Sequence, residues 1–403
     1  MMASSERSAA PDLARGLMLA MIVLSNVVFH LWAAPTGPSG WHPADGSAAD
    51  RITQFLMIVL VDLRIYPLFA FLFGYGMARL MDRQVGRGDS PAAAVRLVRR
   101  RSLLLIAFGL VHAALLLAGD ILAVYGLISL VLGALFLRRT DRSLLVWAAI
   151  FAGLIVVLAL GLNALMLATG VSDAAPGHVA TPGHVEYATG EDGWLAAAAG
   201  RLATWGMLLL GAPAQFGMHA VLLLGIWAAR NRVLEEPARH RRLLVVTAAV
   251  GIPLGWLGAL PSALAHFGVL SVPSGAQADQ GELFLLQAAT GIFAGLGYVA
   301  VFALLATGGW VRRPLAVAVS AAGRRSLSVY LAHSVLLAPV LAAWGLGLGA
   351  HLGSAGAALY ALGAWLLTLA LAFFLERRGL PGPAEALLRR LLYRPQAAAD
   401  VRT

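Results

Sequence analysis

The side chains best suited to chemistry in this chain are polar residues that interrupt long apolar stretches. His112 and Asp120 share the segment HAALLLAGDILAVYG, in which the histidine lies two helical turns before a tight Gly119-Asp120 turn and Tyr125 follows it. Asp120 suits a helix N-cap, and a carboxylate near an imidazole also fixes the tautomer that a general base needs. We predict that His112 is a catalytic base oriented by Asp120. A capping aspartate beside a hydrogen-bonded core histidine is the alternative.

A polar stripe runs along the first apolar segment. Arg15 and Asn26 are eleven residues apart, which is about three helical turns, so both lie on one face about 16 Å apart along the axis. His30 extends the stripe by another turn and is a second candidate base. A helix with such a seam turns it toward the interior of a bundle. In the alternative, Arg15 reaches the headgroups, Asn26 joins helices and His30 sits at the outer interface.

The second apolar segment, DLRIYPLFAFLFGYG, opens with two ionisable residues. Asp62 and Arg64 lie at its start, and neither can stay unpaired at membrane depth, so a structural ion pair is the simple explanation. Pro67 and Gly74 permit a helix break or a close helix approach, which is where transporters and membrane enzymes place sites.

Two later segments carry further polar residues at helical spacing. Gln215 and His219 lie one turn apart after Pro213. One later helix face is expected to hold Ser326, Tyr330, His333 and Ser334. Hydroxyl contacts between helices are the ordinary role of such a set. The residues expected in a polar seam, with a substrate-binding or a structural role, are Tyr125, His219, Tyr330 and His333.

The composition shows which elements must position these residues. The chain has 403 residues, of which 60% are hydrophobic and 12% charged, with a mean hydropathy of +0.79. That is too little polar surface for a soluble globule, so we predict an all-α polytopic membrane bundle in a single domain. About ten spans are expected at 13–34, 62–81, 102–119, 121–137, 143–170, 203–229, 243–265, 284–307, 326–345 and 355–376, with a cytoplasmic amphipathic helix at 383–393.

The basic residues set the expected topology. All 30 are arginines, and most lie in clusters between the apolar stretches. Basic loops stay on the cytoplasmic side, which predicts cytoplasmic termini and a location in the plasma membrane. The loops at 171–193 and 266–283 hold no arginine and are expected outside. The basic loops lack the interleaved aromatics that stack on bases, so the lipid bilayer is the expected partner of this cationic chain and nucleic acid is not.

Several site chemistries are excluded by the sequence. The chain has no cysteine, and therefore no disulfide, thiolate metal site or acyl-cysteine. It contains no HExxH, Walker A loop, strand-associated GxGxxG or GxSxG motif. We predict no metal site and no permanently bound cofactor.

Five motifs resemble one family in order and spacing: DLARGLMLAMIVLSN, FLFGYG, RRRSLLLIAFGLVHAALLLAGDILAVYG, GRRSLSVYLAHS and LPGPAEALLRRLLYRP. Over almost the whole chain they resemble the YeiB-like bacterial membrane proteins, the domain of unknown function 418 family. That family is similar in its first half to heparan-alpha-glucosaminide N-acetyltransferase and, more distantly, to the acyltransferase type three family.

The resemblance implies that acyl-CoA enters from the cytoplasm and that the acyl group leaves on an extracytoplasmic acceptor. Arg15 and Asn26 match an arginine–asparagine pattern of the relatives, and Asp62 fits a D-x-x-F-P-like element. The acetyltransferase places its active-site histidine in the first external loop, where His30 and His42 both lie near and neither aligns securely. His333 also departs from the glutamine that the family usually has.

We therefore expect a membrane acyltransferase that moves an acyl group to an envelope glycan, lipid or small metabolite. The expected acyl group is acetyl. The residues expected at the acyl-CoA site are Arg15, Asn26, Asp62 and Arg64. His112 or His30 would deprotonate the acceptor, so that direct transfer needs no covalent intermediate. A transporter or flippase with a polar seam and a non-catalytic membrane protein are the alternatives, and a homodimer is left open.

Overall fold

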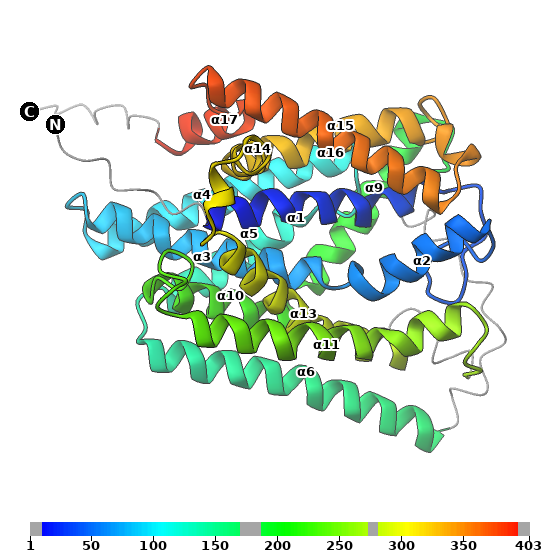
Figure 1. The fold of residues 1–403 in the computed structure, drawn as a ribbon, viewed down its shortest axis with the longest axis horizontal. Helices are drawn as coiled ribbons and strands as arrows, with labels where there is room; N and C mark the ends of the chain where they lie inside the picture. Colours follow the sequence, from blue (N-terminus) through cyan, green and yellow to red (C-terminus); the bar gives the residue numbers. More distant parts are fainter. Residues whose placement is uncertain (1–9, 170–186, 273–280, 394–403) are drawn as a thin grey trace, which may run out of the picture.

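The computed structural model describes residues 10–169, 187–272 and 281–393 of the chain. These residues form a bundle of helices, and their one isolated pair of bridged extended residues is Thr36 with Pro43. The described chain begins and ends at the same end of the bundle, where α1 starts and α17 lies (Figure 1). We call this the arginine-rich end, because clusters such as 99–101 and 241–242 lie there. The predicted all-α membrane class is confirmed.

The helices follow one another along the whole described chain. The first half contains α1 (Ala10–Val27), α2 (Ala48–Leu60), α3 (Ile65–Val85), α4 (Pro91–Leu115), α5 (Ile121–Phe136) and α6 (Asp141–Thr169). The second half contains α9 (Trp194–Gly211), α10 (Phe216–Arg230), α11 (Arg241–His266), α13 (Glu282–Leu305), α14 (Pro314–Arg324), α15 (Ser326–Leu341), α16 (Ser354–Arg377) and α17 (Pro383–Leu392).

Among the described residues, six helices are long and apolar enough to cross a membrane: α1 with its 3-10 extension, α6, α9, α11, α13 and α16. The pair α2 and α3 makes a seventh if the two are one span, bent by 42°. The helices α5, α10 and α15 are apolar but only 15 or 16 residues long, or about 24 Å at 1.5 Å per residue.

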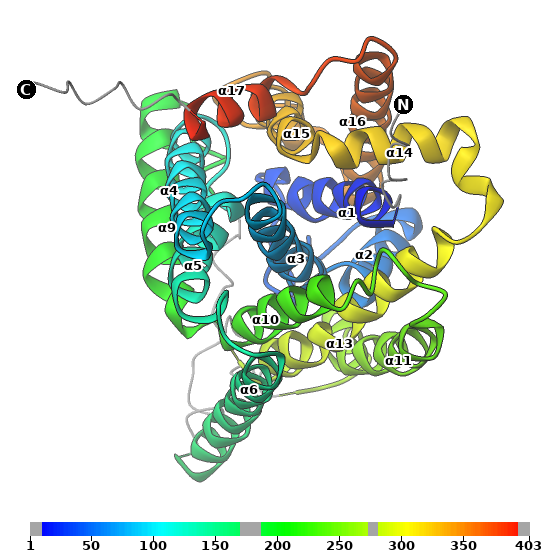
Figure 2. The same cartoon turned by 90° about the vertical axis from the view of Figure 1, so that its left-hand side faces the viewer.

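The expected span at 203–229 is replaced by two separate helices. α9 ends at Gly211, a 3-10 turn spans Ala212–Ala214, and α10 begins at Phe216. Pro213 lies in that turn, where a proline cannot donate the backbone hydrogen bond that would continue α9. α9 runs along the flank formed by α4 and α5, whereas α10 packs on α3 and α6 (Figure 2). The sequence did not indicate this break, because the residues on both sides of the turn are apolar.

Two other stretches differ from the expected spans. The stretch 326–345 is helical only to Leu341, and the preceding α14 was not expected. α14 packs against α1. A Cβ on Gly323 would come within 1.7 Å of the Asp12 carbonyl oxygen, so the glycine permits this approach. Of the two expected external loops, 171–186 and 273–280 lie outside the described residues.

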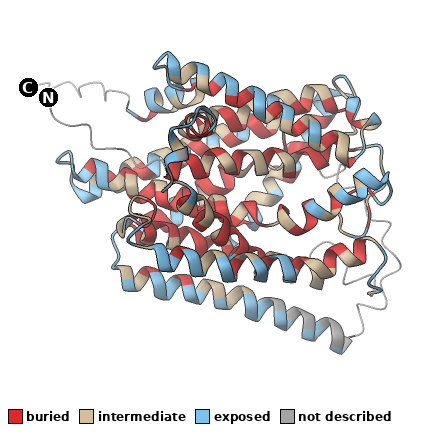
Figure 3. Ribbon diagram, in the orientation of Figure 1, coloured by how far each residue is buried: buried red, intermediate tan, exposed pale blue. Residues whose placement is uncertain are grey.

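Burial follows the pattern of a bundle in lipid. Buried side chains fill the interior, and exposed ones follow the outer faces of helices such as α6 and α11 (Figure 3). Those outer faces are apolar, with Leu160 66% and Leu257 62% exposed. Outer helix faces that expose many leucines suit a hydrocarbon solvent better than water.

A second close packing that positions the site joins α3 to α10. A Cβ on Gly74 would lie 2.1 Å from the Leu222 carbonyl oxygen, and one on Gly225 would lie 2.1 Å from the Phe71 carbonyl oxygen. The two backbones therefore touch, as small residues at helix interfaces in membranes allow. The expected close approach at Gly74 is confirmed.

We predict that Gly225→Val separates α3 from α10 and lowers stability by more than the about 1–3 kcal/mol of ordinary overpacking, because backbone must move. Gly153→Val on α6 is the matched control, since nothing lies within 4 Å of the position of its Cβ. Thermal unfolding in detergent, followed by size-exclusion chromatography, measures both. Equal midpoints for the two variants would contradict the packing.

Candidate functional site

A chain of hydrogen bonds joins α4, the start of α5 and α15 inside the bundle. The His112 Nδ1 atom lies 2.8 Å from an Asp120 carboxylate oxygen, and His112 Nε2 lies 2.8 Å from the Ser334 hydroxyl oxygen. All three side chains are buried, with exposures of 3%, 1% and 5%. The predicted pairing of His112 with Asp120 is therefore present, and Ser334 extends it.

Local structure explains the place of Asp120. Its side chain caps α5, and Oδ2 accepts a hydrogen bond from the Ala123 backbone N–H at 2.9 Å. A Cβ on Gly109 of α4 would come within 2.2 Å of that oxygen, so the glycine leaves room for the carboxylate. Because an ionised carboxylate only accepts, His112 donates from Nδ1 and accepts from the Ser334 hydroxyl at Nε2. This is the tautomer of a base that removes a serine proton.

Arg201 of α9 fixes the end of the helix that carries His112. Its guanidinium donates to the carbonyl oxygens of Ala113 at 3.1 Å and Ala114 at 2.8 Å, and it lies over the Trp344 ring. The last carbonyls of a helix lack partners within that helix, and this buried cation supplies them. Arg201 was not among the predicted site residues, although an arginine inside the apolar stretch of α9 indicates a buried partner.

Tyr330 connects this chain to a cavity. It lies one turn before Ser334 on α15, its ring centroid is 5.1 Å from that of His112, and its hydroxyl accepts from the Ile121 N–H. The same side chain lines the inner part of a cavity of about 310 Å³ that reaches toward the arginine-rich end. The histidine therefore lies directly behind the cavity wall.

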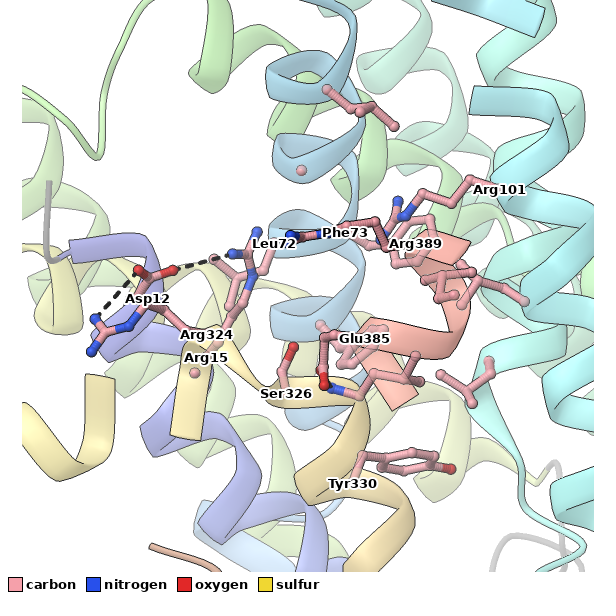
Figure 4. A pocket seen from close by; sticks show the side chains of 18 of the residues that line it. Asp12, Arg15, Leu72, Phe73, Arg101, Arg324, Ser326, Tyr330, Glu385 and Arg389 are labelled. Carbon is pink, nitrogen blue, oxygen red and sulfur yellow. Dashed lines mark hydrogen bonds and ion pairs between the residues drawn. The ribbon is translucent and has the colours of Figure 1, made fainter. Parts of the chain in front are cut away.

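The cavity is lined by both charged and apolar side chains (Figure 4). Its charged lining consists of Arg15, Arg83, Arg101, Arg324, Arg389, Asp12 and Glu385. Its apolar lining includes Met18, Phe69, Leu72, Phe73, Leu105 and Leu122. Arg15 thus has the expected position on a cavity-lining helix face.

The arginines of the cavity outnumber its carboxylates. Asp12 pairs with Arg15 at 3.6 Å and with Arg324 at 3.8 Å. Arg101 precedes the third expected span, and burial, followed by the positive charges of Arg15 and Arg83, lowers its pKa to about 10. An excess of guanidinium groups in a cavity lining, three of them partly buried, favours an anionic ligand, and their planar forks suit phosphate oxygens.

The tail helix α17 forms one wall of this cavity. Glu385 accepts from the backbone N–H groups of Leu327 and Ser328 at the start of α15, at 2.8 and 3.2 Å. On the opposite side, Arg100 of α4 donates to the Leu391 carbonyl oxygen at 2.7 Å. The expected helix at 383–393 is present, and it packs between α4 and α15 (Figure 2).

Asn26 lies beyond the inner end of the cavity. It lines a second, much smaller cavity of about 10 Å³ with Tyr66 and Ile121, and Phe69 lines both cavities. The stripe predicted for α1 therefore touches two spaces that Phe69 separates. His30 hydrogen-bonds through Nδ1 to the Asn26 carbonyl oxygen at 3.2 Å, which gives it a local partner outside the chain of His112.

The expected ion pair of Asp62 with Arg64 is replaced by other contacts. Asp62 lies 2.7 Å from Nε2 of His42, and both side chains are buried. Arg64 donates to the main-chain oxygens of Asp62 and Gly255. The break between α2 and α3 leaves carbonyls without helical partners, which explains this use of a guanidinium. Neither Asp62 nor Arg64 is among the residues that line the arginine cavity, and their expected place at an acyl-CoA site stays a prediction.

Two expected members of the polar seam also lie elsewhere. His219 bonds to the Gln215 carbonyl oxygen at 2.7 Å and packs on Phe151. His333 bonds to the Thr368 hydroxyl of α16 at 3.0 Å. It is one residue from Ser334 and therefore points about 100° away around the helix, so the two side chains of this expected face meet different neighbours.

Tyr125 lies close to the seam, where its hydroxyl donates to the Tyr66 carbonyl oxygen at 2.7 Å and its ring packs 4.6 Å from Phe69. It therefore supports the side chain that separates the two cavities. Across the described residues, no group of three or more histidines and carboxylates is placed to hold a metal ion.

Removing Arg201 should loosen the end of α4. We predict that Arg201→Met lowers stability by at least about 2 kcal/mol, because buried carbonyl oxygens lose their donors. Arg239→Met is the control, since Arg239 is exposed and its ion pair is with nearby Glu236 in the same loop. Thermal unfolding of both variants in detergent checks the difference, and an unchanged midpoint for Arg201→Met would exclude the capping role.

The fold and the site together define a class: a helical membrane protein with a buried serine–histidine–aspartate chain behind an arginine-lined cavity. Comparisons with known proteins agree with the motifs of the sequence. Residues 228–395 match the family described as "Protein of unknown function (DUF418)". The chain is thus similar to the DUF418 family over its second half and to YeiB and YxaH over almost its whole length.

Full-length relatives support this assignment. The uncharacterized protein YeiB of Escherichia coli (strain K12) is 27% identical over 417 residues, which cover 99% of this chain and 99% of YeiB. The uncharacterized protein YxaH of Bacillus subtilis (strain 168) is 26% identical, over 97% of this chain and 95% of YxaH. An uncharacterized 39.9 kDa protein of Bacillus acidopullulyticus is 35% identical over 123 residues, 30% of this chain and 32% of its own length.

Proposed function

We propose that this protein is a plasma-membrane acyltransferase that takes an acyl group, in the simplest case acetyl, from cytoplasmic acyl-CoA. The proposal includes ten membrane crossings, with both termini and the arginine-rich end in the cytoplasm. An even number of crossings places both ends of the chain on one side, which agrees with the start of α1 and the position of α17 at one end of the bundle (Figure 1). The arginine clusters agree with cytoplasmic loops.

The observation that carries the proposal is the combination of groups that line the cavity. Acyl-CoA has phosphates at one end, a long flexible arm, and a thioester at the other end. The cavity lining combines arginines, apolar side chains and Tyr330, whose ring packs against His112. Each part of the ligand therefore has a matching kind of group in the cavity lining.

In this mechanism, Arg15 and Arg101 hold phosphate groups through charge-assisted hydrogen bonds. His112 accepts a proton at Nε2 from the hydroxyl or amine that attacks the thioester, and Asp120 keeps the imidazole in the required tautomer. Asn26, beyond Phe69, is the polar group that meets the acyl group or the acceptor on the other side of this partition. The acceptor is an envelope glycan, a lipid or a small metabolite.

A second candidate is a transporter or flippase. It rests on the two cavities that Phe69 separates, because a side chain between two spaces along one path can act as a gate. Transport requires solute flux without acyl-CoA, whereas the transferase requires saturable CoA binding and release of free CoA.

Binding of labelled acetyl-CoA to the detergent-purified protein tests the proposal. We expect saturable binding that weakens about tenfold, about 1.4 kcal/mol, in Arg15→Ala and again in Arg101→Ala, since each loses a charged phosphate contact. Arg239→Ala, which removes an exposed arginine outside the cavity, should bind as the wild type does.

Dephospho-CoA provides a matched ligand, because it lacks one phosphate and should compete less well than CoA. Absence of saturable binding to protein with a normal unfolding midpoint would contradict the transferase and favour the transporter. Equal loss in all three arginine variants would show that net charge, and no particular cavity residue, governs binding.

A further inference from the structure

Ser334 differs from the other buried hydroxyl groups of this bundle. A hydroxyl on a membrane helix commonly donates to a carbonyl one turn earlier, as Ser102 does to Val98 at 3.0 Å. Ser102 also contacts Ser129, which bonds to the Gly126 carbonyl oxygen. Ser334 instead meets the imidazole of His112, 222 positions away in the chain.

The neighbouring pair of His333 and Thr368 shows what a structural contact between histidine and hydroxyl looks like here. Thr368 also donates to the Trp365 carbonyl oxygen, and Nδ1 of His333 is buried without a partner. That imidazole has no carboxylate to orient it. Only the set around Ser334 therefore combines, among the described residues, a hydroxyl, an imidazole and a carboxylate in series.

We propose that Ser334 is a nucleophile that accepts the acyl group and carries it as a serine ester. The order of bonds, from Asp120 to His112 to Ser334, is that of a catalytic triad, in which the histidine removes the hydroxyl proton. The choice of acyl-CoA as donor rests on the function proposed above. The covalent step replaces the direct transfer expected from the sequence.

The first half-reaction acylates the enzyme. The Ser334 oxygen attacks the thioester carbonyl carbon and its proton passes to Nε2 of His112. The carbon–sulfur bond then breaks, the imidazolium returns the proton to the sulfur, and CoA leaves as the thiol. The new bond is the ester between the serine oxygen and the acyl carbon.

The second half-reaction restores the serine. A hydroxyl or amine of the acceptor attacks the ester carbonyl carbon and gives its proton to His112. The bond between the serine oxygen and the acyl carbon breaks, and the imidazolium protonates that oxygen. Each step transfers only the acyl group and one proton, so no oxidant or reductant is needed.

A covalent carrier suits a donor and an acceptor that approach from opposite sides. With the acyl group on Ser334, next to the Tyr330 wall of the cavity, CoA can depart toward the arginine-rich end before the acceptor binds, so the two substrates need not be bound together. Ser334 is 5% exposed and Tyr330 is 2% exposed. Their burial keeps water from the ester, which otherwise would hydrolyse.

Two labelling measurements on the full-length protein test the proposal. In the first, labelled acetyl-CoA is added, the reaction is quenched in acid, and the peptide containing Ser334 is analysed by mass spectrometry. We expect an acetyl adduct on that serine, its loss to background in Ser334→Ala, and formation about 10²- to 10⁴-fold slower in His112→Gln. Ser129→Ala, which changes a buried hydroxyl outside the set, should acylate as the wild type does.

The chain offers a second variant that does not depend on removing the nucleophile. Because it has no cysteine, Ser334→Cys introduces the only thiol of the protein. This variant should form a thioester that hydroxylamine cleaves at neutral pH, whereas the wild-type ester should resist it. Adducts of unchanged stability in the two proteins would place the acyl group on another residue and overturn the proposal.

The second measurement does not use acyl-CoA. An apolar fluorophosphonate should label Ser334 in the wild type and fail to label His112→Gln. Label without an acetyl adduct would support the nucleophile and overturn acyl-CoA as its donor. Absence of both, in protein with a normal unfolding midpoint, would overturn the role of Ser334, and so would an adduct that persists in Ser334→Ala.

Discussion

Inside a bundle that lies in lipid, every ionisable side chain must find its partner within the protein, because no water is there to supply one. Three such groups make buried contacts at the ends of helices. Asp120 is met by His112 and the α5 N-terminus, Arg201 by the last carbonyls of α4, and Asp62 by His42. Each contact lies where a helix begins or ends, and it pairs a group there with a polar side chain of another segment.

The arrangement of the remaining helices follows from these contacts. α4 ends under Arg201, α5 begins at Asp120, and α15 brings Ser334 to the same place. α1 and α3 then enclose the space in front of this set, and the close approach of α3 to α10 leaves α3 room to line the cavity. The tail helix α17 completes the wall at the arginine-rich end. The arginines, the apolar lining and the hydrogen-bonded set of Asp120, His112 and Ser334 thus lie in one region of the bundle, joined through Tyr330.

The sequence predicted the parts of this account that depend on local spacing. The helical membrane class, the tail helix and the pairing of His112 with Asp120 could be predicted, because apolar length and a turn of a few residues decide them. The contact of Ser334 with His112 could not, since it spans 222 positions and depends on which helices become neighbours. Arg201 was missed for the same reason, because its contacts lie 87 and 88 positions away. The break at Pro213 was hidden because the sequence is apolar on both sides of it.

The most direct test of the central claim is a cryo-electron microscopy structure of the protein with a thioether analogue of acetyl-CoA, which cannot transfer its acyl group. The account predicts that the phosphates lie among Arg15, Arg101 and Arg389 and that the carbonyl carbon of the analogue lies within about 3–3.5 Å of the Ser334 oxygen, the separation of reacting atoms in a near-attack geometry. An analogue bound at another surface, or with its phosphates at the opposite end of the bundle, would contradict it.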